Sequence, residues 1–311
     1  MNALSCKRIG SMGRLFLLGV FLGVVASSCD NSTGSGENPG PLPEYETVDC
    51  QPAWSPTSEW IAFQRRGEET EDLKVIFLIR PDGSGAERMI DLGFEPDWSP
   101  EGDRIIYSDG WDGVSTRVHD LGTDSTWVLF PGGLVFSLDW SPVGWKVAGV
   151  NSADGTPDIC VSSLETLQCR WFGSGGEPDW SPDGSELLCL WNGMSIMDSS
   201  GANRRQIISY ESGEAPVLGA HWHPDGDRIV FCRLDVQTWD YKIWLVNADG
   251  TGLQCLGIGG GPAWSPDGEQ IVFADDVPEG EWRSVRLWIM NADGTERRQL
   301  TFPDTTQLRA Q

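Results

Sequence analysis

A sixfold repeat constrains this chain more than any other feature of its sequence. The tripeptide Trp-Ser-Pro, which is Trp-His-Pro in one copy, recurs at intervals of 44, 42, 40, 42 and 42 residues. The six tryptophans are Trp54, Trp98, Trp140, Trp180, Trp222 and Trp264. A period of this length is typical of folds that stack copies of one supersecondary unit. The chain must therefore fold as a small unit repeated six times.

Each repeat shows the same succession of strands and turns. A β-type run follows the Asp-Gly turn, such as RIVFC at 228–232, and a second run such as KIWLVN at 242–247 follows a variable loop. A turn such as NADGT at 247–251 and a third run complete the unit, and the residues before the tryptophan make one more strand. Glycine tolerates the positive φ angles that such turns need. The pattern predicts four antiparallel strands per unit.

A four-stranded sheet of this size cannot bury both of its faces alone, so such sheets pack radially around an axis. We therefore predict an all-β fold, a six-bladed β-propeller of four-stranded antiparallel blades over 49–304. Each tryptophan should pack against the neighbouring blade, and the proline should end the strand. The first inner strand begins near Cys50 and the last outer strand ends near Thr301, so no strand exchange is expected to close the ring. The tail at 305–311 either pairs beside the first blade or frays.

The motif W-S-P-D-G, followed by a β-type run and N-A-D-G-T, resembles the WD40-like repeat of TolB-type propellers. The resemblance covers roughly 49–304. It implies a periplasmic protein whose propeller serves mainly as a docking surface for other proteins. TolB proper carries an α/β domain ahead of its propeller, and residues 30–48 are too few to form one. The resemblance therefore extends to the propeller and not to a role in the Tol system.

The first 28 residues have the pattern of an export signal. Three basic residues precede the apolar run LFLLGVFLGVVA at 15–26, which is shorter than the roughly 20 residues of a membrane-spanning helix. The following ASSC resembles a lipobox, although alanine stands three residues before the cysteine. We expect lipidation at Cys29 and a membrane anchor, with cleavage without lipid or an uncleaved anchor as alternatives. Residues 29–48 are rich in Gly, Pro and Ser and should form a disordered tether.

The charge of the chain excludes one class of partner. The full chain has 22 basic and 46 acidic residues, and removal of residues 1–28 takes away only basic ones. Such an acidic protein repels nucleic acid phosphates and anionic lipid surfaces. It suits cationic ligands, Ca²⁺ or basic protein partners, although solubility alone would also explain the charge.

The cysteines agree with export and give no metal motif. No CxxC pattern occurs among the eight cysteines. Cys160 and Cys169 would lie directly opposite each other if the chain turned back at 163–166. They could form a disulfide there or remain as two packed thiols.

The innermost strands offer a candidate binding site. If each motif tryptophan points away from the axis, the residue before it and the residue three before it face the channel. These two positions bring together Glu95, Asp97, Asp139, Glu177, Asp179 and His221. The carboxylates could bind a divalent cation such as Ca²⁺ or a basic ligand side chain. Alternatively, they hydrogen-bond backbone amides of neighbouring strands.

Three further tryptophans, Trp111, Trp239 and Trp282, lie in loops between the second and third strands of their units. In a propeller these loops share one rim, where tryptophan could bind a protein or stack on a sugar. Packing between blades is the alternative.

Catalytic patterns are scarce. The chain has three histidines and contains neither G-x-S-x-G nor H-E-x-x-H. His221 and His223 are two apart on one strand, where they could share a metal, but His223 more simply replaces the serine of the motif. We therefore predict a non-catalytic envelope scaffold that docks a protein partner, without a cofactor or nucleic acid. The alternative is a propeller that binds carbohydrate or acts on polysaccharide.

Overall fold

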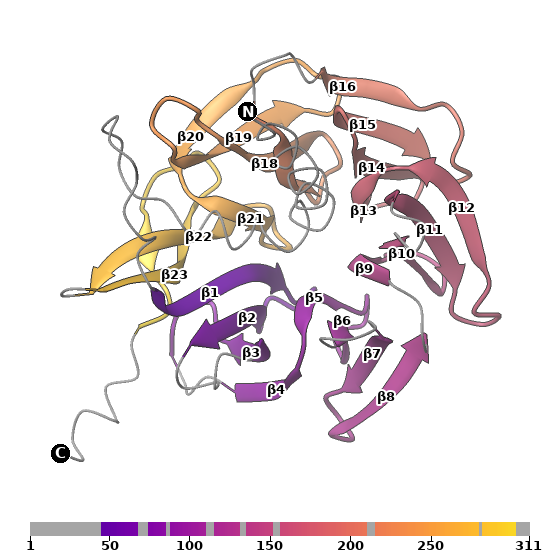
Figure 1. The fold of residues 1–311 in the computed structure, drawn as a ribbon, viewed down its shortest axis with the longest axis horizontal. Coiled ribbons are helices and arrows are strands. Elements are labelled where there is room, and N and C mark those ends of the chain that lie inside the picture. Colours follow the sequence, from indigo (N-terminus) through magenta and orange to yellow (C-terminus); the bar gives the residue numbers. More distant parts are fainter. Residues whose placement is uncertain are drawn as a thin grey trace, which may run out of the picture.

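The computed structural model describes residues 45–67, 74–84, 88–109, 115–130, 135–151, 156–209, 215–279 and 282–302. Every regular element in these ranges is a β-strand, and the sheets follow one another in chain order around a common centre (Figure 1). The prediction of an all-β propeller arrangement with four-stranded antiparallel blades is confirmed. In the same ranges no helix has the length and apolar character to cross a membrane. The signal segment, Cys29 and the tail at 305–311 lie outside the described residues.

Four sheets contain four antiparallel strands each, in chain order. The second unit comprises β5 (Phe94–Trp98), β6 (Arg104–Asp109), β7 (Ser115–Asp120) and β8 (Ser125–Phe130). The third comprises β9 (Val135–Trp140), β10 (Lys146–Asn151), β11 (Asp158–Ser163) and β12 (Cys169–Ser174). The fourth comprises β13 (Gly176–Trp180), β14 (Glu186–Leu190), β15 (Gly193–Asp198) and β16 (Arg205–Ser209). The fifth comprises β17 (Val217–Trp222), β18 (Arg228–Leu234), β19 (Tyr241–Asn247) and β20 (Gln254–Ile258).

The first and sixth units share one eight-stranded sheet, so the described chain does not form six separate sheets. The first unit comprises β1 (Tyr45–Trp54), β2 (Ile61–Gly67), β3 (Val75–Ile79) and β4 (Arg88–Leu92). The sixth comprises β21 (Gly260–Trp264), β22 (Gln270–Glu279), β23 (Trp282–Asn291) and β24 (Arg298–Gln299). Within each of these units, consecutive strands pair antiparallel as they do in the other four.

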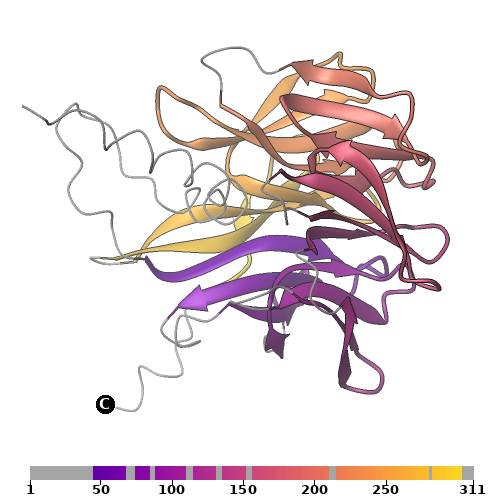
Figure 2. The same cartoon turned by 45° about the vertical axis from the view of Figure 1, so that its right-hand side comes forward.

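The two units are joined by strand pairing that the sequence did not predict. β1 begins at Tyr45, inside the segment expected to be a tether, and pairs in parallel with β23 through Tyr45–Arg283 and Val48–Val285. Figures 1 and 2 both show β1 beside β23. No strand exchange was expected to close the ring, and this expectation is wrong, since the start of β1 pairs with the sixth unit. The link is a parallel pair between the start of the first unit and the third strand of the last.

Each motif tryptophan packs against the unit that precedes its own, as predicted. Trp98 lies in a cluster with Ile76 and Leu78 of the first unit, and Trp264 in a cluster with Val230 and Ile243 of the fifth. The corresponding clusters around the other motif tryptophans contain residues of the preceding unit as well. Burial of the indole rings between successive sheets removes large apolar surfaces from water. The repeated tryptophan therefore holds neighbouring units together.

The rest of the motif builds the turn into the next strand. The serine hydroxyl accepts the backbone N–H five residues later, as Ser99 does from Arg104 at 3.1 Å and Ser265 from Gln270 at 2.9 Å. The turn glycine is left-handed, with φ of 74° at Gly102, a conformation in which a Cβ atom is unfavourable. The motif is therefore explained by local backbone requirements and by packing between units.

Candidate functional site

One cavity of about 310 Å³ lies where the innermost strands meet. Both predicted positions of every unit line this cavity, so the alignment of the repeats placed all twelve residues correctly. They are Gln51, Ala53, Glu95, Asp97, Ser137, Asp139, Glu177, Asp179, Gly219, His221, Gly261 and Ala263.

A β-bulge in each inner strand aims these residues at the cavity. The residue three before the tryptophan is left-handed in all six units, with φ between 44° at Glu177 and 54° at Glu95 and Gly219. The strand register shifts at the same point, for example between Phe94 and Asp97. Because a bulge disturbs simple alternation, intervening residues such as Pro96 line the cavity as well. A left-handed residue other than glycine costs about 1–2 kcal/mol, and four of the six units bear that cost.

The aspartate before the tryptophan binds the next unit. A carboxylate oxygen of Asp97 accepts the backbone N–H of Trp140 at 2.6 Å, and Asp179 accepts that of Trp222 at 2.8 Å. Asp139 accepts the N–H of Trp180 at 2.5 Å. These bonds join residues one repeat apart, so the aspartates fix the spacing of successive inner strands.

The two glutamates repeat this arrangement at the bulge. Glu95 accepts the backbone N–H of Ser137 at 2.5 Å and an amide hydrogen of Gln51 at 3.3 Å. Glu177 accepts the N–H of Gly219 at 2.5 Å. The structural alternative for the acidic residues, hydrogen bonding to neighbouring backbone amides, thus describes all five carboxylates.

Burial shifts the protonation equilibria of these carboxyl groups. It raises the pKa of Asp97 and that of Glu177 to about 7, against the opposing effect of their backbone hydrogen bonds. Burial also raises the pKa of Glu95, although the nearby charge of Lys74 lowers it in part. The pKa of Asp139 is raised by burial and by the charges of Asp179 and Asp97. Asp97 and Glu177 are therefore partly protonated near neutral pH.

His221 is the one imidazole in this cluster. Its Nδ1 lies 2.8 Å from Asp179, whose other oxygen holds Trp222, and 44% of its side chain is exposed. Burial lowers the pKa of His221, but the charge of Asp179 and their hydrogen bond raise it more, and the net shift is upward. Asp179 thus orients the His221 imidazole within the acidic cavity.

His223 does not join His221 in a metal site. Its Nδ1 accepts the backbone N–H of Asp225, and its ring packs edge-on against Trp264 at 4.6 Å between centroids. Together with Asp225 and Asp227 it forms a group of metal-ligand type, but the backbone hydrogen bond occupies the Nδ1 lone pair. His223 therefore takes the place of the motif serine in the fifth turn.

Of the three predicted rim tryptophans, the structure describes the side chain of one. Trp239 is 52% exposed in the loop between β18 and β19. Trp111 lies outside the described residues, and so does the side chain of Trp282, whose backbone begins β23. Their proposed clustering stays a prediction.

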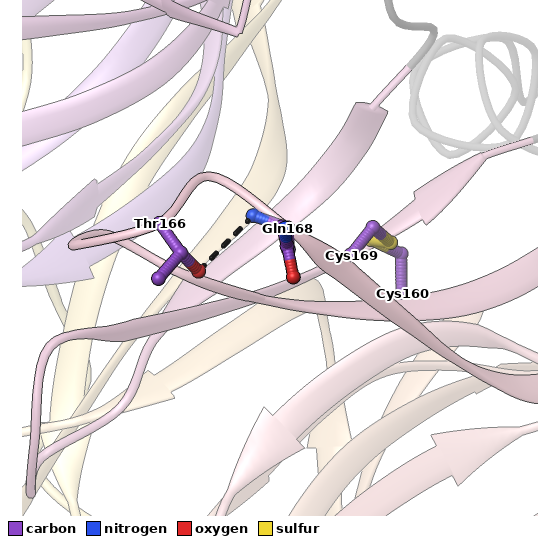
Figure 3. The surroundings of a disulfide bond; sticks show 4 residues. All are labelled: Cys160, Thr166, Gln168 and Cys169. Carbon is purple, nitrogen blue, oxygen red and sulfur yellow. Dashed lines mark hydrogen bonds between the residues drawn. A yellow bond between two sulfur atoms is a disulfide. The ribbon is translucent and has the colours of Figure 1, made fainter.

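Cys160 of β11 and Cys169 of β12 are joined by a disulfide, with Cα atoms 5.7 Å apart (Figure 3). They are not directly opposite, because Cys169 pairs with Ser162 and Cys160 with Trp171. The turn spans 164–168 and includes Leu167 with a φ of 53°, so it lies later in the chain than the predicted 163–166, and the partner of Cys160 becomes Trp171. The disulfide is therefore diagonal across the strand pair.

Some cavity residues were missed by the sequence reasoning. Cys50, Cys232 and Tyr241 also line the cavity. Burial raises the pKa of the Cys50 thiol and that of Cys232 to about 12, so both stay protonated at neutral pH. Cys50 lies in the inner strand β1, one residue before the predicted position, whereas Cys232 and Tyr241 reach the wall from the second and third strands of the fifth unit.

The class of this fold is a TolB-like β-propeller. Its sheets form a ring, an indole packs between successive units, and carboxylates of one inner strand bind backbone N–H groups of the next. Comparisons with known proteins confirm the resemblance over the propeller. A 58-residue segment is 41% identical to the Tol-Pal system protein TolB of Alcanivorax borkumensis, covering 17% of this chain and 13% of that protein. No family model matches the chain.

Two solved structures share the fold. TolB from Acinetobacter baumannii superposes with a TM-score of 0.65 and 20% identity, covering 82% of this chain and 63% of that one. The chain thus spans less than two thirds of that TolB. Oligogalacturonate lyase from Vibrio parahaemolyticus superposes with a TM-score of 0.55 and 13% identity, covering 88% and 85%. At these identities the likeness concerns the fold.

Proposed function

We propose that this protein is a non-catalytic binding propeller of the bacterial cell envelope, and that its acidic cavity receives a basic side chain of a protein partner. The observation that carries the proposal is the fixed cluster of carboxyl groups that the second, third and fourth units place in the cavity. Five acidic residues face one space, and each is held by a backbone N–H of the next unit. Their oxygen atoms are thus held in place before any ligand arrives.

A basic side chain suits this cavity better than calcium does. Calcium requires six to eight oxygen ligands, whereas both oxygens of Asp179 and of Glu95 already accept hydrogen bonds. A single ammonium or guanidinium group needs fewer acceptors, and its charge favours the ionised forms of Asp97 and Glu177. The carboxylates are also poor candidates for acid–base catalysis, because their hydrogen bonds hold successive inner strands together.

Three further elements complete the proposal. The eight-stranded sheet corresponds to two adjoining blades, which makes a ring of six. Cys29 carries the lipid, and residues 30–44 link the anchor to the propeller. Support for an envelope location comes from the export-type N-terminus and from the likeness to TolB, the named component of a Tol-Pal system.

The experiment compares the full-length protein with a variant that carries Asp97→Asn and Glu177→Gln. The amide oxygens of the new side chains can still accept the N–H groups of Trp140 and Gly219, so the fold is kept while charge is removed. Chemical crosslinking in intact cells and mass spectrometry should identify a protein partner with the wild type and lose it with the variant. An unchanged partner would exclude the cavity, and no partner with either protein would exclude docking. Calcium should leave the melting temperature unchanged.

A second candidate function is carbohydrate binding or action on polysaccharide. It is favoured by the exposed Trp239 and by the shared fold with a protein named oligogalacturonate lyase. A glycan array separates the two candidates, because only this second function predicts glycan binding that Trp239→Ser abolishes.

A further inference from the structure

The third unit departs from the other repeats in its first turn. Its sequence is WSPVGWK at 140–146, with Val143 and Trp145 at two positions that are polar in all other units. The equivalent residues elsewhere are Thr57 and Glu59, Glu101 and Asp103, Asp183 and Ser185, Asp225 and Asp227, and Asp267 and Glu269. The two apolar side chains are 49% and 50% exposed. The turn itself therefore gives no packing reason for them.

Two further exposed apolar side chains lie around this turn. Leu167, 49% exposed, belongs to the 164–168 loop, whose Leu164 N–H donates to the Trp145 carbonyl at 2.8 Å. Trp127 of β8, 41% exposed, pairs across the strands with Val118, which packs against Trp140 at the base of the turn. We call Trp127, Val143, Trp145 and Leu167 the third-turn patch.

Arg104 links Trp145 to the face of the second unit that bears Trp127. The guanidinium carbon of Arg104 lies 5.9 Å from the centre of the Trp145 ring. Arg104 pairs with Asp120 in the strand register, and Ile106 pairs with Val118 two residues further along the same strands. Since side chains two apart on a strand share a face, Arg104 lies on the same face as Trp127. The patch thus spans the junction of the second and third units.

Carboxylates flank the third-turn patch, beside the exposed Lys146 of the same turn. Asp120 binds Arg104 at 3.3 Å and neutralises it, and Glu165 lies within the loop that bears Leu167. On the other side, a Cβ atom on Gly184 would lie 2.1 Å from Val143, which puts the exposed Asp183 turn against the patch. An apolar centre with an acidic rim is the complement of a basic segment with apolar anchors. Anionic lipid would be repelled by the same rim.

We propose that the third-turn patch docks a cationic amphipathic segment of a partner protein, at a site separate from the central cavity. This rests on the proposed function, that the chain binds protein. The apolar side chains of the segment cover Val143, Trp145 and Leu167, and its lysine or arginine residues face the carboxylate rim. Trp127 closes the site at the outer strand of the second unit.

The test uses a defined probe and a variant designed from the protein itself. Val143→Asp with Trp145→Ser gives the third turn the residues of the fourth, WSPDGS, so the fold should be kept, and a melting curve checks this. A fluorescent peptide of alternating leucine and lysine should bind the full-length wild type. The variant should bind at least about tenfold more weakly, a loss of about 1.4 kcal/mol. Trp191→Ser, which removes a tryptophan of similar exposure (42%) from the fourth unit, should bind as the wild type does.

Further probes decide between the occupants. A leucine and glutamate peptide should not bind, and salt should weaken binding of the lysine peptide. Equal binding by wild type and turn variant would overturn the proposal. So would binding of anionic vesicles in place of the peptide, or a dimer in sedimentation that the variant loses. Peptide binding abolished only by Asp97→Asn with Glu177→Gln would overturn the patch and leave the cavity proposal standing.

Discussion

The hydroxyl of Thr301 donates a hydrogen bond to the carboxylate of Asp49 at 2.6 Å, across 252 residues of sequence. Asp49 is fully buried in β1 and also accepts two hydrogen bonds from Arg65, at 2.5 and 2.8 Å. Arg286 of the sixth unit lies 3.6 Å from the same carboxylate. This buried network joins the first and last units at the parallel β1–β23 pair. The ring is therefore closed by charge and hydrogen bonding as well as by strand pairing.

Thr301→Val should destabilise the protein by about 2 kcal/mol, because it removes a bond to a buried carboxylate and leaves the N–H of Leu287 without its acceptor at 2.9 Å. Denaturant unfolding measures the change. Thr295→Val makes the same chemical change in an exposed turn of the same unit and should cost less than about 0.5 kcal/mol. Similar losses in both variants would show that the Asp49 network does not hold the ring.

Stability should fall as pH rises from about 5 to about 8. Burial raises the pKa of Asp97 and Glu177 to about 7, above their unfolded values, so the folded state holds more protons in this window. The stabilisation that protonation of Asp97 and Glu177 gives is complete below the pKa that these groups have in the unfolded chain. It is lost as the pH rises through about 7. The raised pKa of His221 acts in the same direction. Melting temperatures measured across this range test the sign.

The variant with Asp97→Asn and Glu177→Gln is the control for this pH dependence. Its amides do not titrate, so its melting temperature should change less between pH 5 and 8 than that of the wild type. A wild type that gains stability with rising pH, or a variant with the same slope, would contradict the assignment to these two carboxyl groups.

The cavity was predictable from the sequence because a single rule applied to every copy. Once the tryptophan was assigned to the interface, strand alternation placed Asp97 and Glu95 toward the axis, and the same offsets held in all units. The left-handed conformation was visible only in part. Glycine at positions 219 and 261 is compatible with a positive φ and hints at it. Glu95 and Ser137 give no such hint, because the β-bulge imposes the positive φ on them.

Ring closure and the disulfide register could not be predicted for a different reason. Parallel pairing of β1 with β23 joins segments some 240 residues apart and follows no local pattern. The register between Cys160 and Cys169 depends on where the chain turns, and a turn centred one residue later than predicted moved Cys169 opposite Ser162. By contrast, the unusual third turn can be recognised in the sequence, because an alignment of the repeats puts Val143 and Trp145 at positions that are polar in the other copies.

Ser137→Gly should stabilise the protein by about 0.5–1 kcal/mol. Ser137 has a φ of 49° at a position where the fifth and sixth units have glycine, and relief of this strain exceeds the greater chain entropy of glycine when unfolded. Ser209→Gly in β16, where φ is not positive, should instead destabilise by about 0.5–1 kcal/mol. Denaturant unfolding compares the two. A loss in both variants would mean that the bulge imposes no strain at Ser137.

Replacing both Cys160 and Cys169 by serine should lower the free energy of unfolding by about 2–3 kcal/mol. The disulfide closes a loop with a sequence separation of 9, and a loop of this size restricts the unfolded chain by about that amount. Cys255→Ser removes an exposed free thiol and should leave stability unchanged within about 0.5 kcal/mol. Reduction of the wild type should reproduce the loss of the double variant and have no effect on that variant. If reduction destabilised both proteins equally, the loss would have to come from a bond other than Cys160–Cys169.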